Sequence, residues 1–296
     1  MYTHKSRSFL LKNHLKSVLG STRYQSRFIR GREWTWLEAG SPRASETVVL
    51  LHGLAMSKNH WRVVMPILAK HFRIIVPDIP GFKIGTMAAN PEQGFEGLTK
   101  ELTLFMDSVI DQATHLVGHS MAATLATGLA LRMPIPVKSV TLVSLAEGTF
   151  NEALVKVLQA RTVSEFMRDY TEQDHIVYVR SMFHRPTSSL DLIARNSWRH
   201  IRNHKQSIAE LCAAMESELN YLENYAESLS VPILIVNGQQ DLWRDLTKEL
   251  RYFSGPNVQR LNLDECRHLP FIEQPIQFSD ALLQFLLSIR TIKGVA

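Results

Sequence analysis

Residues 115–131 read HLVGHSMAATLATGLAL, and this stretch decides the fold. The apolar residues 115–117 predict a short strand, Gly118 to Ser120 a sharp turn, and residues 122–132 a helix built from small side chains. In a turn of this kind a serine is held in a strained conformation, with its hydroxyl projecting at the head of the helix. The flanking residues must be small because strand and helix nearly touch. We therefore expect Ser120 to be a nucleophile.

The turn departs from the common G-x-S-x-G pattern at its last position, where this chain has Ala122. The added methyl group should be tolerated, because Ala123 and Ala126 keep the following helix slim. Taken alone, the motif also fits a buried serine in a tight turn. The nucleophile assignment therefore depends on partners elsewhere in the chain.

Two such partners follow downstream, each just after a predicted strand. Asp241 comes after the run PILIV and the turn NGQQ, and His268 lies 27 residues later on the loop after LNL. A serine hydroxyl is a poor nucleophile unless an imidazole takes its proton and a carboxylate orients that imidazole. The alternatives are a helix N-cap for Asp241 and a surface-loop residue for His268. Other carboxylates that could fill the acid role are Asp245, Glu249 and Glu147.

A third element of the predicted site is the loop His52-Gly53-Leu54, which ends a buried strand. The backbone N–H groups of Leu54 and Met121 are the expected donors to an oxyanion. We place Gly53 and His52 beside the substrate. Gly53 lets the chain approach it closely, and His52 braces the loop without acting chemically.

Strand and helix patterns alternate along most of the chain, which predicts an α/β fold with a mostly parallel, doubly wound sheet. Between residues 147 and 225 no buried strand pattern occurs, so we expect a helical lid inserted into the fold. The predicted units are a basic N-terminal segment, 1–32, a first core part, 33–146, the lid, 147–225, and a second core part, 226–296. The expected strands are 32–39, 47–51, 72–76, 115–117, 137–143, 231–236 and 258–263. The expected helices are 61–70, 99–111, 122–132 and 277–289.

The net charge of +5 is concentrated at the N-terminus. Residues 1–32 hold eight lysines and arginines and no acid, so residues 33–296 carry 25 basic against 28 acidic side chains. Leu11, Leu15, Val18 and Leu19 share one helical face here, which fits a helix in peripheral contact with an anionic membrane surface. It also fits a helix packed on its own domain, or a transit peptide.

Composition and motifs narrow the function classes. No apolar run is long enough for a transmembrane helix, and the separated Cys212 and Cys266 indicate a reducing compartment without a disulfide or zinc site. No glycine-rich nucleotide motif occurs, so nucleotide chemistry has no support. Acyl transfer by Ser120 requires no metal or cofactor, and we expect none. We expect a cytoplasmic protein, or one held at a membrane surface.

Between residues 179 and 205 the predicted lid carries a cluster of basic residues, including Lys205, that is opposed only by Asp191. Such a face can dock an acidic acyl carrier protein or anionic lipid, although it also fits a plain solvated surface. Nucleic acid is a poor candidate, because the rest of the body is acidic. The arginines of this cluster are Arg180, Arg185, Arg195, Arg199 and Arg202.

The stretches LLHG, PDIPGF, GHSMA, NGQQD and CRHLPFIEQP resemble, in order, the signatures of the α/β-hydrolase superfamily. The likeness covers roughly 33–145 and 228–290 and is greatest to lid-bearing esterases, monoacylglycerol-type lipases and biotin-pathway methyl esterases. Arg267 stands where a glycine usually precedes the catalytic histidine, which brings a fixed positive charge next to that histidine in the sequence.

Together these features predict a serine carboxylic-ester hydrolase that acts through an acyl-enzyme on a small-molecule or lipid ester with an apolar acyl chain. One alternative is a carrier-protein-dependent esterase such as the pimeloyl-[acyl-carrier protein] methyl ester esterase of biotin synthesis. Carbon–carbon bond hydrolysis would need the same three side chains. A hydrolase-fold receptor that binds a ligand without turnover is the alternative of another class.

Overall fold

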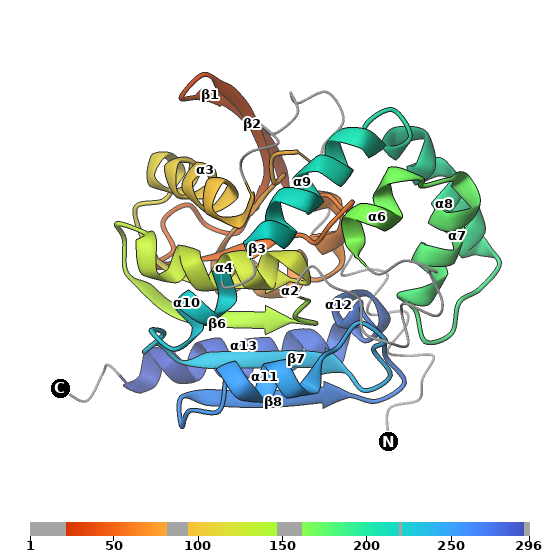
Figure 1. The fold of residues 1–296 in the computed structure, drawn as a ribbon. Helices are drawn as coiled ribbons and strands as arrows, with labels where there is room; N and C mark the ends of the chain where they lie inside the picture. Colours follow the sequence, from red (N-terminus) through yellow and green to blue (C-terminus); the bar gives the residue numbers. More distant parts are fainter. Residues whose placement is uncertain (1–21, 82–93, 147–161, 219–220, 293–296) are drawn as a thin grey trace.

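The computed structural model describes residues 22–81, 94–146, 162–218 and 221–292, and its centre is an eight-stranded sheet. The strand order is β1-β2-β4-β3-β5-β6-β7-β8 (Figure 1). The six strands from β4 to β8 run parallel, which confirms the predicted α/β fold. The strands are β1 Arg23–Ile29, β2 Arg32–Ala39, β3 Glu46–Leu51, β4 Arg73–Pro77, β5 Ala113–His119, β6 Val137–Val143, β7 Ile233–Gly238 and β8 Val258–Leu263.

Strand β1 was not expected, because residues 23–32 were assigned to a separate basic N-terminal segment. In the structure β1 pairs antiparallel with β2, which in turn pairs antiparallel with β4. As an edge strand, β1 is mostly exposed, and Tyr24 and Phe28 are 60% and 72% accessible. Arg27 on this strand donates to the Ser108 carbonyl at 3.1 Å, which attaches β1 to a segment far along the chain. The sheet therefore begins at Arg23, within the predicted N-terminal segment.

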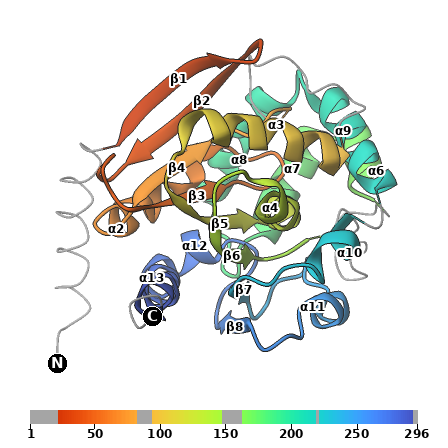
Figure 2. The ribbon, with the colours of Figure 1, turned by 90° about the vertical axis from the view of Figure 1, so that its left-hand side faces the viewer.

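Helices cover both faces of the sheet. Figure 2 shows α2 and α13 on one side and α3, α4, α10 and α11 on the other. The helices outside the β6–β7 connection are η1 Lys58–Val63, α2 Met65–Leu68, α3 Gly94–Val109, α4 Met121–Arg132, α11 Leu246–Tyr252, α12 Pro270–Glu273 and α13 Pro275–Ile292.

The single helix expected over 61–70 is replaced by two short ones. The 3₁₀ helix η1 ends at Val63, and α2 begins at Met65 with Pro66 in its first turn. Proline has no N–H to continue a helix from the preceding turn but fits the first turn of a new one, so Pro66 divides the segment.

The core lies on both faces of the sheet, as a parallel sheet requires. All six residues of β3 are buried. On the α3 side Trp34 stacks on Phe105 with ring centroids 4.6 Å apart, and on the opposite side Trp61 stacks on Phe271 at 4.0 Å. The first pair joins β2 to α3, and the second joins η1 to α12, which follows directly after the loop of His268.

The connection between β6 and β7 is helical in its described part, as expected from the sequence. Its helices are α6 Val163–Arg168, α7 Glu172–Ser181, α8 Ser189–Ile201, α9 Lys205–Ser217 and α10 Tyr221–Ala226. Figure 1 shows α6, α7 and α8 beyond the end of the sheet toward which β6, β7 and β8 point. Helix α10 packs against α4 and thus belongs to the core layer. Residues 147–161 of the predicted lid lie outside the described residues.

Among the described helices, none is both long and apolar enough to cross a lipid bilayer. The amphipathic helix predicted around Leu11 to Leu19 lies outside the described residues.

Candidate active site

Ser120 forms the turn between β5 and α4, as the sequence predicted. Its backbone has φ 55° and ψ −123°, a conformation that costs a residue with a side chain on the order of 1–3 kcal/mol. The Ser120 N–H donates to the Val143 carbonyl at 2.8 Å, which holds the turn against β6. This hydrogen bond to β6 therefore helps to hold Ser120 in its strained conformation.

Two glycines allow this turn to be so tight. A Cβ on Gly118 would lie 2.1 Å from the Ala122 carbonyl oxygen, whereas Ala122 itself is fully buried and fits. A Cβ on Gly53 would lie 2.9 Å from the His119 ring and 3.1 Å from the Ser120 Cβ. From the sequence we expected Gly53 to lie close to the substrate. In the structure it lies close to the Ser120 turn.

Ser120, His268 and Asp241 are joined by hydrogen bonds in a row. The Ser120 Oγ lies 2.9 Å from the His268 Nε2, and the His268 Nδ1 lies 2.9 Å from the Asp241 Oδ2. Because a carboxylate only accepts, Nδ1 carries the proton and donates to it, which leaves Nε2 to accept from Ser120. The side chains of His268 and Asp241 are almost fully buried. The structure thus brings all three predicted residues together.

Residues that the sequence analysis did not single out hold His268 in place. The Trp243 ring stacks on the His268 imidazole with ring centroids 5.1 Å apart, and the backbone N–H of Trp243 donates to the Asp241 Oδ1 at 2.9 Å. The His119 Nε2 donates to the His268 carbonyl at 2.8 Å. Burial lowers the pKa of His119 well below its usual range, so that ring is neutral. For His119, its place directly before Ser120 was the feature of the sequence that could have indicated this supporting role.

The other candidate acids have different surroundings. Glu249 is buried and accepts from Asn237 at 2.8 Å and from the Arg244 guanidinium at 3.0 Å, so its charge is engaged away from His268. Asp245 lies immediately before α11. Glu147 lies outside the described residues.

His52 braces the loop after β3, as expected. Its Nε2 accepts from the Ile79 N–H at 2.9 Å, and its Nδ1 donates to the Gly53 carbonyl at 2.9 Å. Burial lowers its pKa to about 4, so the ring is neutral and fixed in this tautomer. The brace sets the position of Leu54, one of the two predicted oxyanion donors.

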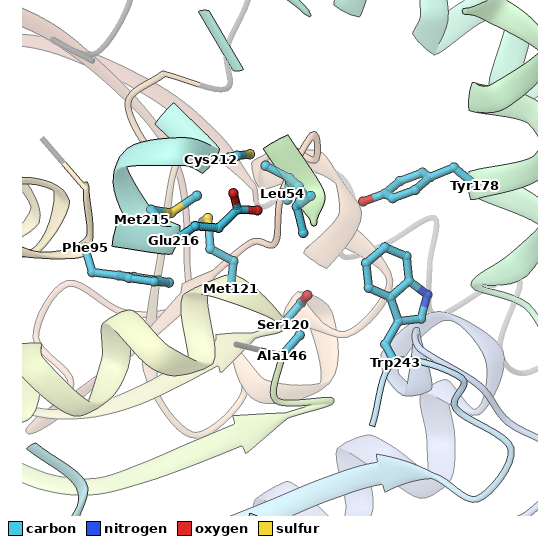
Figure 3. Close-up of a pocket in the computed structure, with 11 residues that line it drawn as sticks. Leu54, Phe95, Ser120, Met121, Ala146, Tyr178, Cys212, Met215, Glu216 and Trp243 are labelled. Atoms are coloured by element: carbon cyan, nitrogen blue, oxygen red, sulfur yellow. The ribbon is translucent and has the colours of Figure 1, made fainter. Parts of the chain in front are cut away.

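A pocket that is partly open to solvent lies over Ser120. Both predicted oxyanion residues, Leu54 and Met121, line it, and Met121 opens α4, where a first-turn N–H has no acceptor within its own helix. Figure 3 shows Tyr178 and Trp243 on one side of Ser120. The remaining lining residues are Phe95, Ala146, Val163, Cys212, Met215 and Glu216.

A family model described as the alpha/beta hydrolase fold matches residues 46–275. The chain belongs to this family. The match covers most of the chain, including Ser120, Asp241 and His268, and confirms the resemblance stated from the sequence motifs.

Relatives with several activities are similar to this member of the family. Monoacylglycerol lipase ABHD6 of Bos taurus is 23% identical over 90% of this chain and 83% of the relative. Pimeloyl-[acyl-carrier protein] methyl ester esterase of Vibrio vulnificus (strain YJ016) is 28% identical over 80% and 93%. The 2-hydroxy-6-oxo-6-(2'-aminophenyl)hexa-2,4-dienoic acid hydrolase of Metapseudomonas resinovorans is 26% identical over 89% and 91%. All three are named as hydrolases of different substrates.

Solved structures confirm the α/β-hydrolase fold. A bacterial membrane phospholipase A has a TM-score of 0.80 with 21% identity, covering 95% of this chain and 93% of that one. The meta-cleavage product hydrolase CumD of Pseudomonas fluorescens IP01 has a TM-score of 0.74 with 21% identity, covering 89% and 97%. At this identity the likeness concerns the fold alone.

Arg267, the departure from the family pattern, points toward the inserted helices. Its guanidinium lies 3.5 Å from the Ser181 carbonyl at the C-terminal end of α7, where a positive charge is favourable. Its backbone N–H donates to Glu273 at 2.7 Å, and the same carboxylate accepts from the His184 N–H at 2.6 Å. Glu273 thus ties the loop that carries His268 to the segment after α7.

The predicted basic cluster is partly neutralised within the described residues. Arg199 and Arg202 are exposed and have no ion-pair partner there, whereas the other three arginines do. The pairs are Arg180 with Asp191, Arg185 with Glu265 and Arg195 with Glu172. No group of three metal-ligating side chains occurs in the part of the chain that the structure describes.

Proposed function

We propose that this chain is a serine carboxylic-ester hydrolase that works through an acyl-enzyme. The observation that carries the proposal is the row of hydrogen bonds from Ser120 through His268 to Asp241. In such a row the imidazole takes the serine proton as the oxygen attacks the acyl carbon, and the carboxylate stabilises the imidazolium that forms.

The second half of the reaction uses the same groups in reverse. Once His268 has given the serine proton to the leaving alcohol, it takes a proton from the water that attacks the acyl-enzyme and returns that proton to the Ser120 oxygen as the acid is released. The N–H groups of Leu54 and Met121 are the proposed donors to the oxyanion in both steps, since both residues line the pocket over Ser120. Because donors on a braced loop and at a helix start are fixed beforehand, they need no reorganisation during reaction.

The inserted helices serve as the lid of this site. Tyr178 from α7, Val163 from α6 and Met215 from α9 all line the pocket. Most lining side chains are apolar, which favours an apolar acyl chain over a sugar or peptide. Among the relatives, the named monoacylglycerol lipase is of this substrate type.

A carrier-protein-dependent esterase is the second candidate, favoured by exposed Arg199 and Arg202 on the outer part of the insertion. If an acidic carrier docks there, kcat/KM for a carrier-bound ester falls steeply as salt rises from 50 to 300 mM, because steering between opposite charges is screened. A small neutral ester is the control and should be nearly indifferent to salt.

The test of the proposed function is hydrolysis of p-nitrophenyl esters of increasing acyl length by wild type and Ser120→Ala. The proposal expects hydrolysis that disappears in the variant, with the best chain length reporting the depth of the pocket. Activity retained in Ser120→Ala would place the reaction elsewhere. A folded wild type that hydrolyses no ester would favour carbon–carbon bond hydrolysis or a ligand receptor.

A further inference from the structure

A carboxylate stands in the wall of this mostly apolar pocket. Glu216 lies near the end of α9 and lines the pocket together with Ser120. Its Oε1 accepts from the Ser164 N–H at 2.9 Å, and its Oε2 accepts from the Ser164 hydroxyl. These bonds cap the start of α6 and hold the carboxylate in place. Figure 3 shows it among Met121, Met215 and Cys212.

No positive side chain balances this charge within the described residues. Glu216 forms no ion pair there, and none of the residues lining the pocket is a lysine, arginine or histidine. The pKa of the Cys212 thiol, which also lines the pocket, is raised mainly by burial and to a smaller extent by the negative charge of Glu216. A group that enters this side of the pocket therefore meets an uncompensated negative charge.

The position of Glu216 relative to His268 decides which part of an ester meets it. Figure 3 shows Glu216, Met215 and Phe95 on one side of Ser120, with Tyr178 and Trp243 on the other. Trp243 stacks on His268, so the second side is the side of the imidazole. Because that imidazole must reach the leaving oxygen, the alcohol occupies the Trp243 side. The acyl chain then extends toward Glu216.

We propose that Glu216 selects the acyl group: it admits neutral chains, favours those with a hydroxyl that can donate to its carboxylate, and excludes chains that end in a carboxylate. The inference rests on the proposed ester hydrolysis and specifies its substrate class. Two carboxylates in one apolar pocket repel each other, whereas a hydroxyl donor finds free lone pairs on Glu216. A carrier-bound or esterified acyl end that is neutral remains compatible.

The test compares three p-nitrophenyl esters with one leaving group: hexanoate, 6-hydroxyhexanoate and the adipate monoester. For wild type we expect kcat/KM on the adipate monoester to be at least about tenfold below that on hexanoate, from charge repulsion at short range. In Glu216→Gln, which keeps an oxygen for Ser164, the adipate-to-hexanoate ratio should rise about tenfold and the advantage of the hydroxylated chain should shrink. Glu210→Gln removes the same charge from the exposed side of α9 and should leave all three rates unchanged.

Two results overturn the inference: an adipate-to-hexanoate ratio that Glu216→Gln leaves unchanged, or one that Glu210→Gln raises equally. Dissociation constants of the three esters for Ser120→Ala, measured by calorimetry, separate this inference from the proposed function. If wild type hydrolyses none of the esters, the proposed reaction is wrong. The order of binding, with and without Glu216→Gln, still decides whether Glu216 selects the acyl group.

Discussion

Ser120 combines a strained backbone with a complete set of side-chain partners. The strain is maintained by the Ser120 N–H bond to Val143 and by Gly118, whose missing side chain lets α4 begin against β5. The partners come from loops 121 and 148 residues farther along the chain. The hydroxyl is therefore presented in one orientation before any substrate binds, which is the condition for efficient nucleophilic attack.

Asp241 fixes which nitrogen of His268 faces Ser120. In Asp241→Asn the side-chain amide can donate to Nδ1 and so favours the wrong tautomer, and we expect kcat to fall by about 10⁴-fold. Ester hydrolysis by the purified variant measures the effect. Asp245→Asn, at an exposed position four residues away, is the matched control and should retain wild-type kcat. Near-normal activity of Asp241→Asn would show that another carboxylate orients the imidazole.

The sequence predicted Ser120, Asp241 and His268 because each follows an apolar run at the end of a parallel strand, where such ends share one edge of the sheet. It did not predict the support given by His119 and Trp243. Those contacts depend on how residues from separate loops meet in space, which the spacing of residues along the chain does not predict.

The inserted helices are bound to the loop that carries His268. The Met182 carbonyl accepts from the His268 N–H at 3.1 Å, and Glu273 accepts from both Arg267 and His184. Tyr178 on α7 packs edge-on against Trp243 at 5.4 Å. Three separate contacts therefore join α7 and the segment after it to the surroundings of His268.

Glu273→Ala should weaken this connection. It leaves the Arg267 and His184 N–H groups without an acceptor, so we expect the free energy of unfolding to fall by about 1–3 kcal/mol. We also expect kcat to fall about tenfold with little change in KM, because His268 is less well placed. Urea unfolding and ester kinetics measure the two effects.

Glu265→Ala is the control on the same loop, since it removes only the exposed ion pair with Arg185. It should change the unfolding free energy by no more than about 0.5 kcal/mol. Equal effects of the two variants on stability and on kcat would show that Glu273 has no special role in joining the insertion to the loop.

The buried strands were the elements that the sequence predicted well. An unbroken apolar run indicates a strand that is buried on both faces, and β3, β4 and β7 all contain such a run. Strand β1 escaped notice because an edge strand buries little and its arginines suggested a charged leader. The helix expected over 61–70 is divided at Pro66. The spacing of the apolar residues alone did not reveal this break.

Several buried histidines link the stability of the whole molecule to pH. Burial lowers the pKa values of His52, His115 and His175 from 6.5 to about 4, and the three lie in widely separated parts of the fold. Each is neutral in the native protein and binds a proton on unfolding once the pH is below 6.5. The native state is therefore favoured above pH 6.5 and loses stability as the pH falls from there toward 4.

Each such histidine contributes a slope of up to about 1.4 kcal/mol per pH unit in that window. We expect the unfolding free energy, measured in urea, to be nearly flat from pH 8 to 7 and to fall between pH 6 and 4.5. His175→Gln should reduce the slope by about one proton, whereas exposed His71→Gln should not. A flat profile down to pH 5 would contradict neutral burial of these rings.

The central claim is that Ser120 is a nucleophile activated by His268. The most direct measurement is the intact mass of the protein after reaction with a fluorophosphonate, for wild type, Ser120→Ala and His268→Gln, each shown to be folded by circular dichroism. We expect one adduct per chain on wild type at residue 120, none on Ser120→Ala, and greatly slowed labelling of His268→Gln. A wild type that stays unmodified, or an adduct that persists in Ser120→Ala, would contradict it.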